Sequence, residues 1–251
     1  IKVYGPVPQF DIDEPVGCGE VQVNFINTSE NVKSFYMEYG DASRIDSNVI
    51  KPHLYSYNDF TKDSILYFPR MFAVDDSNCL SVFRDTVKLY RPPTAKFTVS
   101  DSFGCSPFTV AFTNTSKYGS KYFWDFNGDG DVEDTTFSPS YTYSLPGTYS
   151  VSLRVVTNKG CEETYYKKDF IVVNPVPEAK FSYTPSVVCW GDTVKFSDSS
   201  LSNVPIKRWH WDFDDGGLLD DTSGNQHPSY VFRRAGFHTV RLIIENENGC
   251  V

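Results

Sequence analysis

The stretch SYTYSLPGTYSVSLRVV (140–156) decides the fold class of this protein. Aromatic and β-branched residues alternate with polar ones on both sides of a Pro-Gly pair, which is typical of two strands joined by a turn. Segments of the same character occur at 109–114, 122–126 and 168–173, separated by Gly, Pro, Asn and Ser. No helix-length amphipathic segment interrupts them, so we predict an all-β chain.

The pattern around this stretch occurs three times along the chain, and repetition of this length indicates tandem domains. FINTS begins at Phe25, FTNTS at Phe112 and FSDSS at Phe196, which are 87 and 84 residues apart. Other blocks recur in the same order, including YMEYGD, FWDFNGD and HWDFDDG. Several short strands in each repeat favour three tandem immunoglobulin-like β-sandwiches.

Two proline-rich connectors, YRPPTAKF (90–97) and NPVPEAKF (174–181), mark the expected domain boundaries. They divide the chain into domains at 1–91, 92–174 and 175–251, which we call the first, middle and third repeats. The third repeat stops at Val251, before a counterpart of the last strand of the other two. We therefore expect it to lack that strand here, and we interpret the chain as a piece of a longer polypeptide.

The sequence contains six cysteines, two in each repeat, and they indicate the compartment in which the protein occurs. Because one early and one late cysteine recur in each repeat, we predict the disulfides Cys18–Cys79, Cys105–Cys161 and Cys189–Cys250. The alternative, a zinc site, lacks a CxxC pair and histidines that recur in register. Disulfides are typical of an oxidising compartment, so we expect the protein in a periplasm, at a cell surface or outside the cell.

Composition and charge exclude other function classes. The 251 residues are 40% hydrophobic and 16% aromatic, which is typical of a folded β-rich protein. The formal net charge is −9, and the basic residues form no patch, so we expect no nucleic-acid partner. No apolar run approaches the length of a bilayer span, so we expect no membrane insertion.

The blocks GCSPFTVAFTNTS (104–116), YFWDFNGDGD (122–131) and SPSYTYSLPGTYSVSLRVVTNKGC (138–161) closely resemble PKD (polycystic kidney disease) domains. The third repeat matches through CWGDTVKFSDSS (189–200) and WHWDFDDG (209–216), whereas the first repeat is a divergent copy. The paired cysteines are similar to those of PKD arrays in large surface proteins of gliding bacteria, which leave the cell by type IX secretion. This resemblance implies a seven-stranded sandwich that serves as a spacer or adhesive module.

The segment FWDFNGDGDVED (123–134) offers a candidate calcium site. Oxygen ligands at alternate positions followed by glycine are typical of calcium loops, although Thr136 stands where a bidentate Glu is expected. The alternative is a plain polar turn, and calcium would in either case not be required for the fold. The candidate ligands are Asp125, Asn127, Asp129, Asp131 and Glu133, with a weaker set in the third repeat at Asp214, Asp215, Asp220 and Asp221.

Aromatic side chains offer a second candidate site. Trp124 and Trp211 share one repeat position, and we predict that both pack in a core. Trp209 is the candidate for a glycan contact if a bulge turns it outward. The sequence contains no nucleophile elbow, HExxH motif or phosphate loop, so we predict no catalytic residues and no enzymatic activity.

These observations predict a non-catalytic extracellular rod or spacer of a large bacterial surface adhesin, linked to gliding motility and type IX secretion. The expected partners are neighbouring repeats of the same chain, with surface polysaccharide or secretion and motility machinery as candidates. One alternative is a glycan- or protein-binding PKD module of a secreted hydrolase. Another is a fragment captured by a secretion machine.

Overall fold

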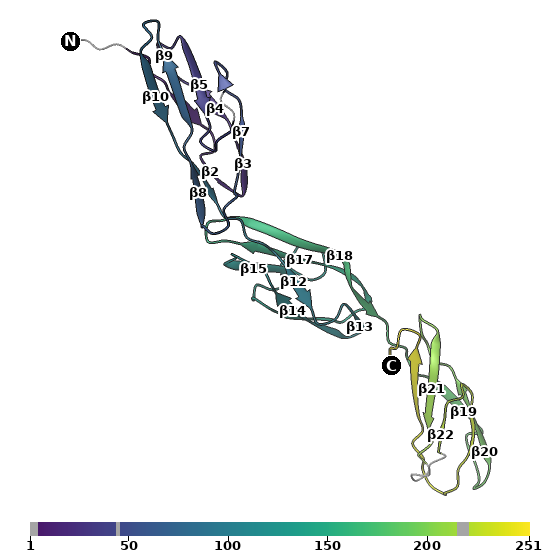
Figure 1. Ribbon diagram of the computed structural model, residues 1–251. Coiled ribbons are helices and arrows are strands. Elements are labelled where there is room, and N and C mark those ends of the chain that lie inside the picture. Colours follow the sequence, from purple (N-terminus) through teal and green to yellow (C-terminus); the bar gives the residue numbers. More distant parts are fainter. Residues whose placement is uncertain (1–4, 44–45, 215–220) are drawn as a thin grey trace. The chain divides into compact units, whose positions relative to one another are not determined.

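The computed structural model describes residues 5–43, 46–214 and 221–251 (Figure 1). Every regular element in these ranges is a β-strand, which confirms the predicted all-β class. None of the described residues belongs to a helix long and apolar enough to cross a bilayer. Asp215 and Asp220, two of the weaker candidate calcium ligands, lie outside the described residues.

The chain folds into two compact units. The boundary between the units passes through the middle repeat, so the three-domain division remains a prediction. Each unit combines one whole terminal repeat with part of the middle one. The first unit contains Ile1–Phe97, Thr115–Trp124 and Leu153–Tyr165, and the second contains Thr98–Asn114, Asp125–Ser152 and Tyr166–Val251.

The first repeat forms sheets in the orders β1-β4, β3-β7, β10-β9-β5-β6 and β2-β11-β8. Alternate residues of its strands point into one core, as period-2 patterning requires. Met71, Val87 and Leu89 are fully buried there. The strands are β1 (Phe10–Ile12), β2 (Val16–Cys18), β3 (Glu20–Val23), β4 (Phe25–Asn27), β5 (Ser34–Glu38), β6 (Asp46–Ser47), β7 (His53–Ser56), β8 (Ser64–Tyr67), β9 (Arg70–Val74), β10 (Leu80–Arg84) and β11 (Val87–Tyr90).

A long two-part hairpin runs along the first repeat. β8 continues into β9, and β10 returns through β11, so that Leu80 lies opposite Val74 and Tyr90 lies opposite Ser64. The turn at 75–79 is therefore at one end of the hairpin, and Tyr90 is at the other. β2 pairs in parallel with β11 and brings Cys18 next to Tyr90.

The middle repeat forms two sheets, in the orders β12-β14-β16 and β13-β18-β17-β15. The Pro-Gly pair leads into β17 as predicted, and the last strand, β18, has 13 residues. β13 pairs in parallel with the end of β18, where Cys105 faces Asn174. The strands are β12 (Phe97–Val99), β13 (Phe103–Cys105), β14 (Phe108–Asn114), β15 (Lys121–Asp125), β16 (Ser140–Tyr143), β17 (Gly147–Val156) and β18 (Glu162–Asn174).

The third repeat forms sheets in the orders β19-β20-β23 and β22-β21-β24. As expected, its described residues contain no counterpart of β11 or β18. Trp211 and Phe213 are buried in its core, and Trp124 is buried in the middle repeat, as predicted for both tryptophans. The strands are β19 (Phe181–Thr184), β20 (Thr193–Asp198), β21 (Ile206–Asp212), β22 (Thr222–Ser223), β23 (Ser229–Val231) and β24 (Arg241–Asn246).

The third repeat differs from the middle one in two further features. β17 has ten residues, whereas its counterpart β24 has six, because the segment 236–240 before β24 forms no strand. A groove of about 610 Å³ opens beside that segment, and the Phe237 side chain is fully exposed at it. The lining includes Tyr183, Val188, Trp190, Phe196 and Val240.

Candidate functional site

The three late cysteines occupy turns of one design, at 75–79, 157–161 and 246–250. In each turn the first residue donates its N–H to the cysteine carbonyl, and its side-chain oxygen accepts the N–H groups of the third and fifth residues. The fourth residue takes a positive φ, which suits Asn and Gly. The fourth residues are Asn78, Gly160 and Gly249, with φ of 59°, 84° and 78°.

Two of the three early cysteines, Cys18 and Cys105, also share one setting. Cys18 and Cys105 end short strands that pair in parallel with the last strand of their own repeat. The following residue then donates its N–H to the end of that last strand, from Gly19 to Tyr90 at 3.1 Å and from Ser106 to Asn174 at 2.9 Å. Cys18 and Cys105 are thereby fixed beside the chain that leaves their repeats.

The predicted disulfides within repeats are wrong. The structure contains Cys18–Cys161 and Cys105–Cys250, whereas Cys79 and Cys189 are free and exposed. The pairings Cys18–Cys79, Cys105–Cys161 and Cys189–Cys250 do not occur.

The geometry of the last strand explains this correction. In the middle repeat the 13 residues of β18 separate the turn that holds Cys161 from Asn174, beside which Cys105 lies. A strand of that length spans about 40 Å, whereas bonded cysteines need Cα atoms roughly 4.4–6.8 Å apart. The observed pairs have Cα–Cα distances of 5.5 and 5.6 Å. Each disulfide therefore joins the early cysteine of one repeat to the turn cysteine of the next, and we call this arrangement a joint.

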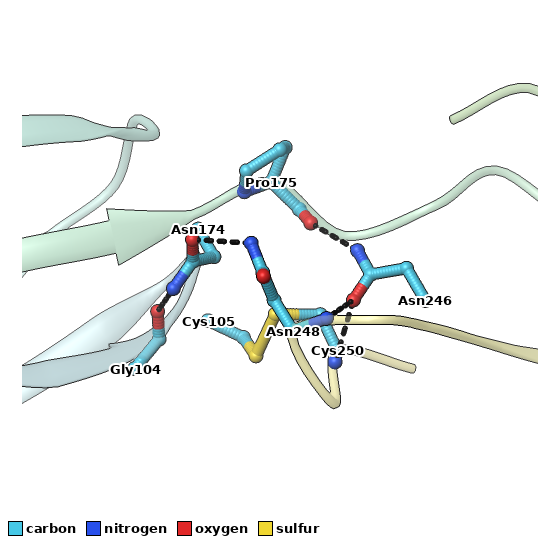
Figure 2. Close-up of a disulfide and its surroundings, with 7 residues drawn as sticks. All are labelled: Gly104, Cys105, Asn174, Pro175, Asn246, Asn248 and Cys250. Carbon is cyan, nitrogen blue, oxygen red and sulfur yellow. Dashed lines mark hydrogen bonds between the residues drawn. A yellow bond between two sulfur atoms is a disulfide. The ribbon is translucent and has the colours of Figure 1, made fainter. Parts of the chain in front are cut away.

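The joint at Cys105–Cys250 is surrounded by asparagine side chains (Figure 2). Asn174 donates to the Gly104 carbonyl at 3.3 Å and accepts the Asn248 side-chain amide at 2.7 Å. Asn246 is fully buried, and its amide group donates to the Pro175 carbonyl at 3.0 Å. The same side chain also accepts both turn N–H groups, so it ties the turn to the segment that connects the two repeats.

The joint at Cys18–Cys161 uses charged and aromatic side chains instead. The Arg91 guanidinium lies 3.9 Å from the Tyr118 ring centre, which is a cation–π contact, and it also pairs with Asp63. Glu163 accepts the Ala95 N–H at 2.8 Å. Contacts from both repeats therefore fix the connector around residues 91–95.

The acidic turn after β15 brings three of the five candidate calcium ligands together. Asp125, Asp129 and Glu133 have carboxylate oxygens within 4.8 Å of one another. Asp131 is outside this group, and Asn127 contacts Asp129 through a 2.8 Å side-chain hydrogen bond. A calcium ion needs six to eight oxygens, so these carboxylates supply part of a coordination shell.

The same turn is also well supported without an ion. The buried Asp125 carboxylate accepts three backbone N–H groups, from Asn127, Gly128 and Gly130, at 3.2, 2.6 and 3.0 Å. Glu133 accepts the Phe126 N–H at 2.8 Å. Burial raises the pKa of the Glu133 carboxyl above its ordinary value, and the charges of Asp125 and Asp129 raise it further.

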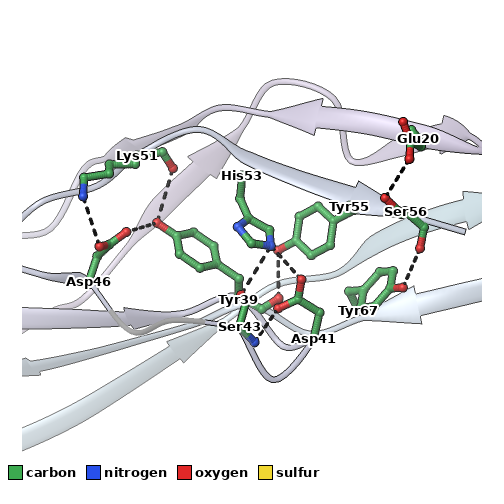
Figure 3. Close-up of polar contacts among 10 residues, drawn as sticks. All are labelled: Glu20, Tyr39, Asp41, Ser43, Asp46, Lys51, His53, Tyr55, Ser56 and Tyr67. Atoms are coloured by element: carbon green, nitrogen blue, oxygen red, sulfur yellow. Dashed lines mark hydrogen bonds and ion pairs between the residues drawn. The ribbon is translucent and has the colours of Figure 1, made fainter. Parts of the chain in front are cut away.

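A Ser-His-Asp cluster in the first repeat does not have the geometry of a catalytic triad (Figure 3). His53 Nε2 lies 2.7 Å from Asp41 Oδ2 and 3.4 Å from Ser43 Oγ. A triad uses the two ring nitrogens separately, one for the carboxylate and the other for the hydroxyl. Here one nitrogen contacts both groups, so the cluster has the geometry of a loop anchor.

The aromatic residues around His53 support that structural role. The Tyr39 ring stacks on the imidazole at 4.2 Å, and Tyr55 lies edge-on to it at 4.7 Å. Burial raises the pKa of Tyr39 to about 12, and its hydrogen bond to Asp46 contributes to the shift. The Tyr55 hydroxyl donates to the Tyr39 carbonyl, so this phenol is also engaged in the fold.

Comparison with known proteins identifies the family. The sequence profile of the PKD domain matches residues 90–173 and 174–251, which together make up more than half of the chain. The chain belongs to the PKD domain family.

Two further comparisons concern a bacterial protease. The pre-pro-metalloprotease PrtV of Vibrio cholerae is 28% identical over 131 residues, and the match covers 52% of this chain and 13% of the protease. The crystal structure of the PKD1 domain of that protease is 32% identical, and the match covers 33% of this chain and 96% of the domain, with a TM-score of 0.27.

Another solved structure that is similar to this chain is the I-band fragment I67–I69 of titin. It is 10% identical, and the match covers 89% of this chain and 83% of the fragment, with a TM-score of 0.38.

PKD domains are generally non-catalytic accessory modules, so this PKD chain is assigned to that class. Its two disulfides, together with the family, indicate an extracellular or secreted protein.

Trp209, the candidate glycan contact, is half-buried in the third PKD repeat. Its indole N–H donates to Asp198 at 2.8 Å, and its ring packs against the core cluster of Trp211 and Phe213. Trp190 is far more accessible, with 77% of its surface exposed. Glycan binding through Trp209 stays a prediction.

Sequence reasoning missed the asparagines of the second PKD joint, namely Asn174, Asn246 and Asn248. One signal could have indicated them. In the middle repeat the last strand, β18, begins directly after Cys161, so its length separates the two cysteines of that repeat. Asn174 and Asn246 then fall next to the cysteines that meet.

Proposed function

We propose that this chain is a spacer segment of tandem PKD domains in a large bacterial cell-surface adhesin, associated with gliding motility and type IX secretion. The observation that carries the proposal is the joint, because each disulfide links one repeat covalently to the next. A covalent link beside a connector reduces the freedom of that connector to bend. Such a segment holds an attached adhesive domain at a defined distance from the cell.

Two measurements test this proposal. Small-angle scattering of the chain with Cys79→Ser and Cys189→Ser, which keeps the two disulfides and lacks the free thiols, is expected to give a monodisperse, elongated particle, and a compact globular profile would contradict the spacer. Antibodies against the segment are expected to label intact cells of the source organism, and deletion of its type IX translocon is expected to remove the label. Labelling that survives the deletion would reject the link to type IX secretion.

We propose a second candidate, an accessory module of a secreted hydrolase, because the similarity to a metalloprotease favours it. The exposed Trp190 beside the groove of the third repeat is a suitable contact for an insoluble polymer. Sedimentation with chitin, cellulose or collagen tests this alternative, with Trp190→Ala as the matched variant. Retention that the variant loses would favour the module over the spacer.

We also propose that the acidic turn of the middle repeat binds a calcium ion as a local stiffener. The three carboxylates within 4.8 Å of one another support this site. An ion there would relieve the repulsion that raises the pKa of Glu133. It would affect the rigidity of one repeat and not the function of the whole segment.

A further inference from the structure

The two free cysteines are of opposite kinds. Cys79 is a turn cysteine, whereas Cys189 stands seven residues before Phe196, as Cys105 stands seven before Phe112. Both thiols are exposed. One free cysteine is therefore a turn cysteine and the other is an early cysteine, and these are the two types that bond to each other in the joints.

The Cys79 turn is built like the two turns whose cysteines are bonded. Asp75 Oδ1 accepts the N–H groups of Ser77 and Cys79, both at 2.9 Å. Asn246 Oδ1 does the same for Asn248 and Cys250, at 3.1 and 3.0 Å. Cys161 and Cys250, whose turns match this one, are each bonded to the early cysteine of another repeat. The turn thus presents Cys79 as Cys161 and Cys250 are presented.

We propose that Cys79 and Cys189 are the two halves of a further joint, and that each bonds the complementary cysteine of another PKD repeat. Cys79 takes an early cysteine, and Cys189 takes a turn cysteine. In a solution of this chain alone, the complementary repeat is supplied by a second copy, so Cys189 of one copy bonds Cys79 of the next. Such head-to-tail contacts do not close on themselves and extend into a linear series.

The bond forms by thiol–disulfide exchange with a small disulfide such as oxidised glutathione. The Cys189 thiolate attacks the glutathione disulfide, which releases one glutathione and leaves a mixed disulfide. The Cys79 thiolate of the second copy then displaces the other glutathione. Two protein thiols are oxidised to one disulfide, one glutathione disulfide is reduced to two thiols, and both protons remain in solution or on the released glutathione.

The test mixes two single variants that each keep one free thiol. Cys79→Ser retains Cys189, and Cys189→Ser retains Cys79, so a joint can form only between the two. In a glutathione redox buffer the equimolar mixture is expected to give a covalent dimer at a yield at least about tenfold above either variant alone. Peptide mapping is expected to place the bond between Cys79 and Cys189.

The last strand of the third repeat is supplied in a parallel sample. Since Gly19 and Ser106 each donate to the end of a last strand, a peptide with the sequence Glu162–Asn174 is added. A dimer that forms with or without this peptide supports the proposal. Absence of the dimer under both conditions would overturn it, and so would equal yields of mixed and self-paired dimers.

A matched pair of variants tests the turn itself. Asp75→Ala in the Cys189→Ser chain removes the acceptor that shapes the Cys79 turn, and it is expected to lower the dimer yield several-fold. Asp76→Ala changes the exposed neighbour, which forms an ion pair with the exposed Lys33, and it is expected to leave the yield unchanged. Equal yields from both variants would show that an unshaped thiol reacts as well, which would overturn the proposal.

Discussion

At the scale of single residues, Glu133 both stabilises the acidic turn by a hydrogen bond and is repelled by the neighbouring carboxylates. Its carboxylate accepts the Phe126 N–H, yet burial and two neighbouring aspartates raise its pKa. A carboxyl whose pKa is raised by folding binds its proton more tightly in the folded state than in the unfolded state. Its ionisation therefore costs stability as the pH rises through the raised pKa.

Glu133→Gln is expected to raise the stability of the metal-free protein at neutral pH by less than about 1 kcal/mol, because the site is partly exposed. The amide oxygen can still accept the Phe126 N–H, while the charge is gone. Thermal unfolding between pH 4 and 7 measures the effect, and the variant is expected to lose part of the decline seen as the pH rises.

Calcium provides the complementary prediction at the same residue. Calcium at 100 times its dissociation constant is expected to stabilise the unmodified protein by about 2.7 kcal/mol, and Glu133→Gln is expected to lose most of that gain. Asp131→Asn is the control, because Asp131 lies outside the carboxylate group and should leave the response intact. An unmodified protein whose melting temperature ignores excess calcium would refute the site.

Asn246 is the residue on which the second joint depends most. Asn246→Ala leaves two turn N–H groups and the Pro175 carbonyl without this partner, inside a buried site. We expect a loss of about 2–3 kcal/mol, measured by denaturant unfolding of the oxidised chain. Glu247→Ala, at the exposed next position of the same turn, should change the stability by less than about 0.5 kcal/mol. Comparable losses from both variants would contradict the role assigned to Asn246.

At the scale of elements, the third repeat differs from the middle repeat in the segment before β24. β17 forms strand from Gly147, whereas the matching segment from Gly236 to Val240 stays irregular, and the groove opens beside it. In the middle repeat, β18 lies next to β17 in the sheet, and its Ile171 and Val173 side chains are buried. The groove therefore has the geometry to accept an extended segment with apolar residues at alternate positions.

A peptide with the sequence of Lys168–Asn174 is expected to bind this groove with a dissociation constant on the order of 0.1–1 mM, through two buried side chains and edge pairing with β24. Trp190 fluorescence and amide exchange in residues 236–240 measure binding, and the amides should become protected. A control peptide with Ile171→Asp and Val173→Asp keeps the length and is expected not to bind. Equal binding of both peptides would reject strand addition.

The strands themselves could be predicted from the sequence because period-2 alternation and turn residues are local signals. The segment 148–156 and the acidic position of Asp125 at a strand end were predicted correctly for this reason. The cysteine pairing could not be predicted by counting, because recurrence within a repeat does not say which ends of the strands meet. Cys105 and Cys161 recur together, yet the length of β18 separates them.

The acidic turn shows the same limit on a smaller scale. Alternate spacing indicated five oxygen ligands, but the chain curls around the Asp125 carboxylate, which accepts three backbone N–H groups. That curl brings Asp129 and Glu133 to Asp125 and leaves Asp131 outside the group. Spacing in the sequence indicates which residues are available, whereas the hydrogen bonds of the turn decide which of them converge.

At the scale of the whole molecule, the two disulfides interlock. Cys105 lies within the loop closed by Cys18–Cys161, and Cys161 lies within the loop closed by Cys105–Cys250. The two bonded pairs are consequently connected by three parallel stretches of chain, 18–105, 105–161 and 161–250. When the ends are pulled apart after unfolding, the shortest stretch, 105–161, becomes taut first and the other two remain slack.

This covalent arrangement predicts the reach of the unfolded chain under force. With both disulfides intact, the taut path contains roughly 74 residues, which extend to about 260 Å at ~3.5 Å per residue. With both disulfides reduced, all 251 residues extend to about 880 Å. Single-molecule pulling from the two termini, with and without a reducing agent, measures this difference. Equal lengths would contradict the interlocked pairing, whereas a roughly threefold difference would give the segment a built-in limit on extension, as a surface spacer under load requires.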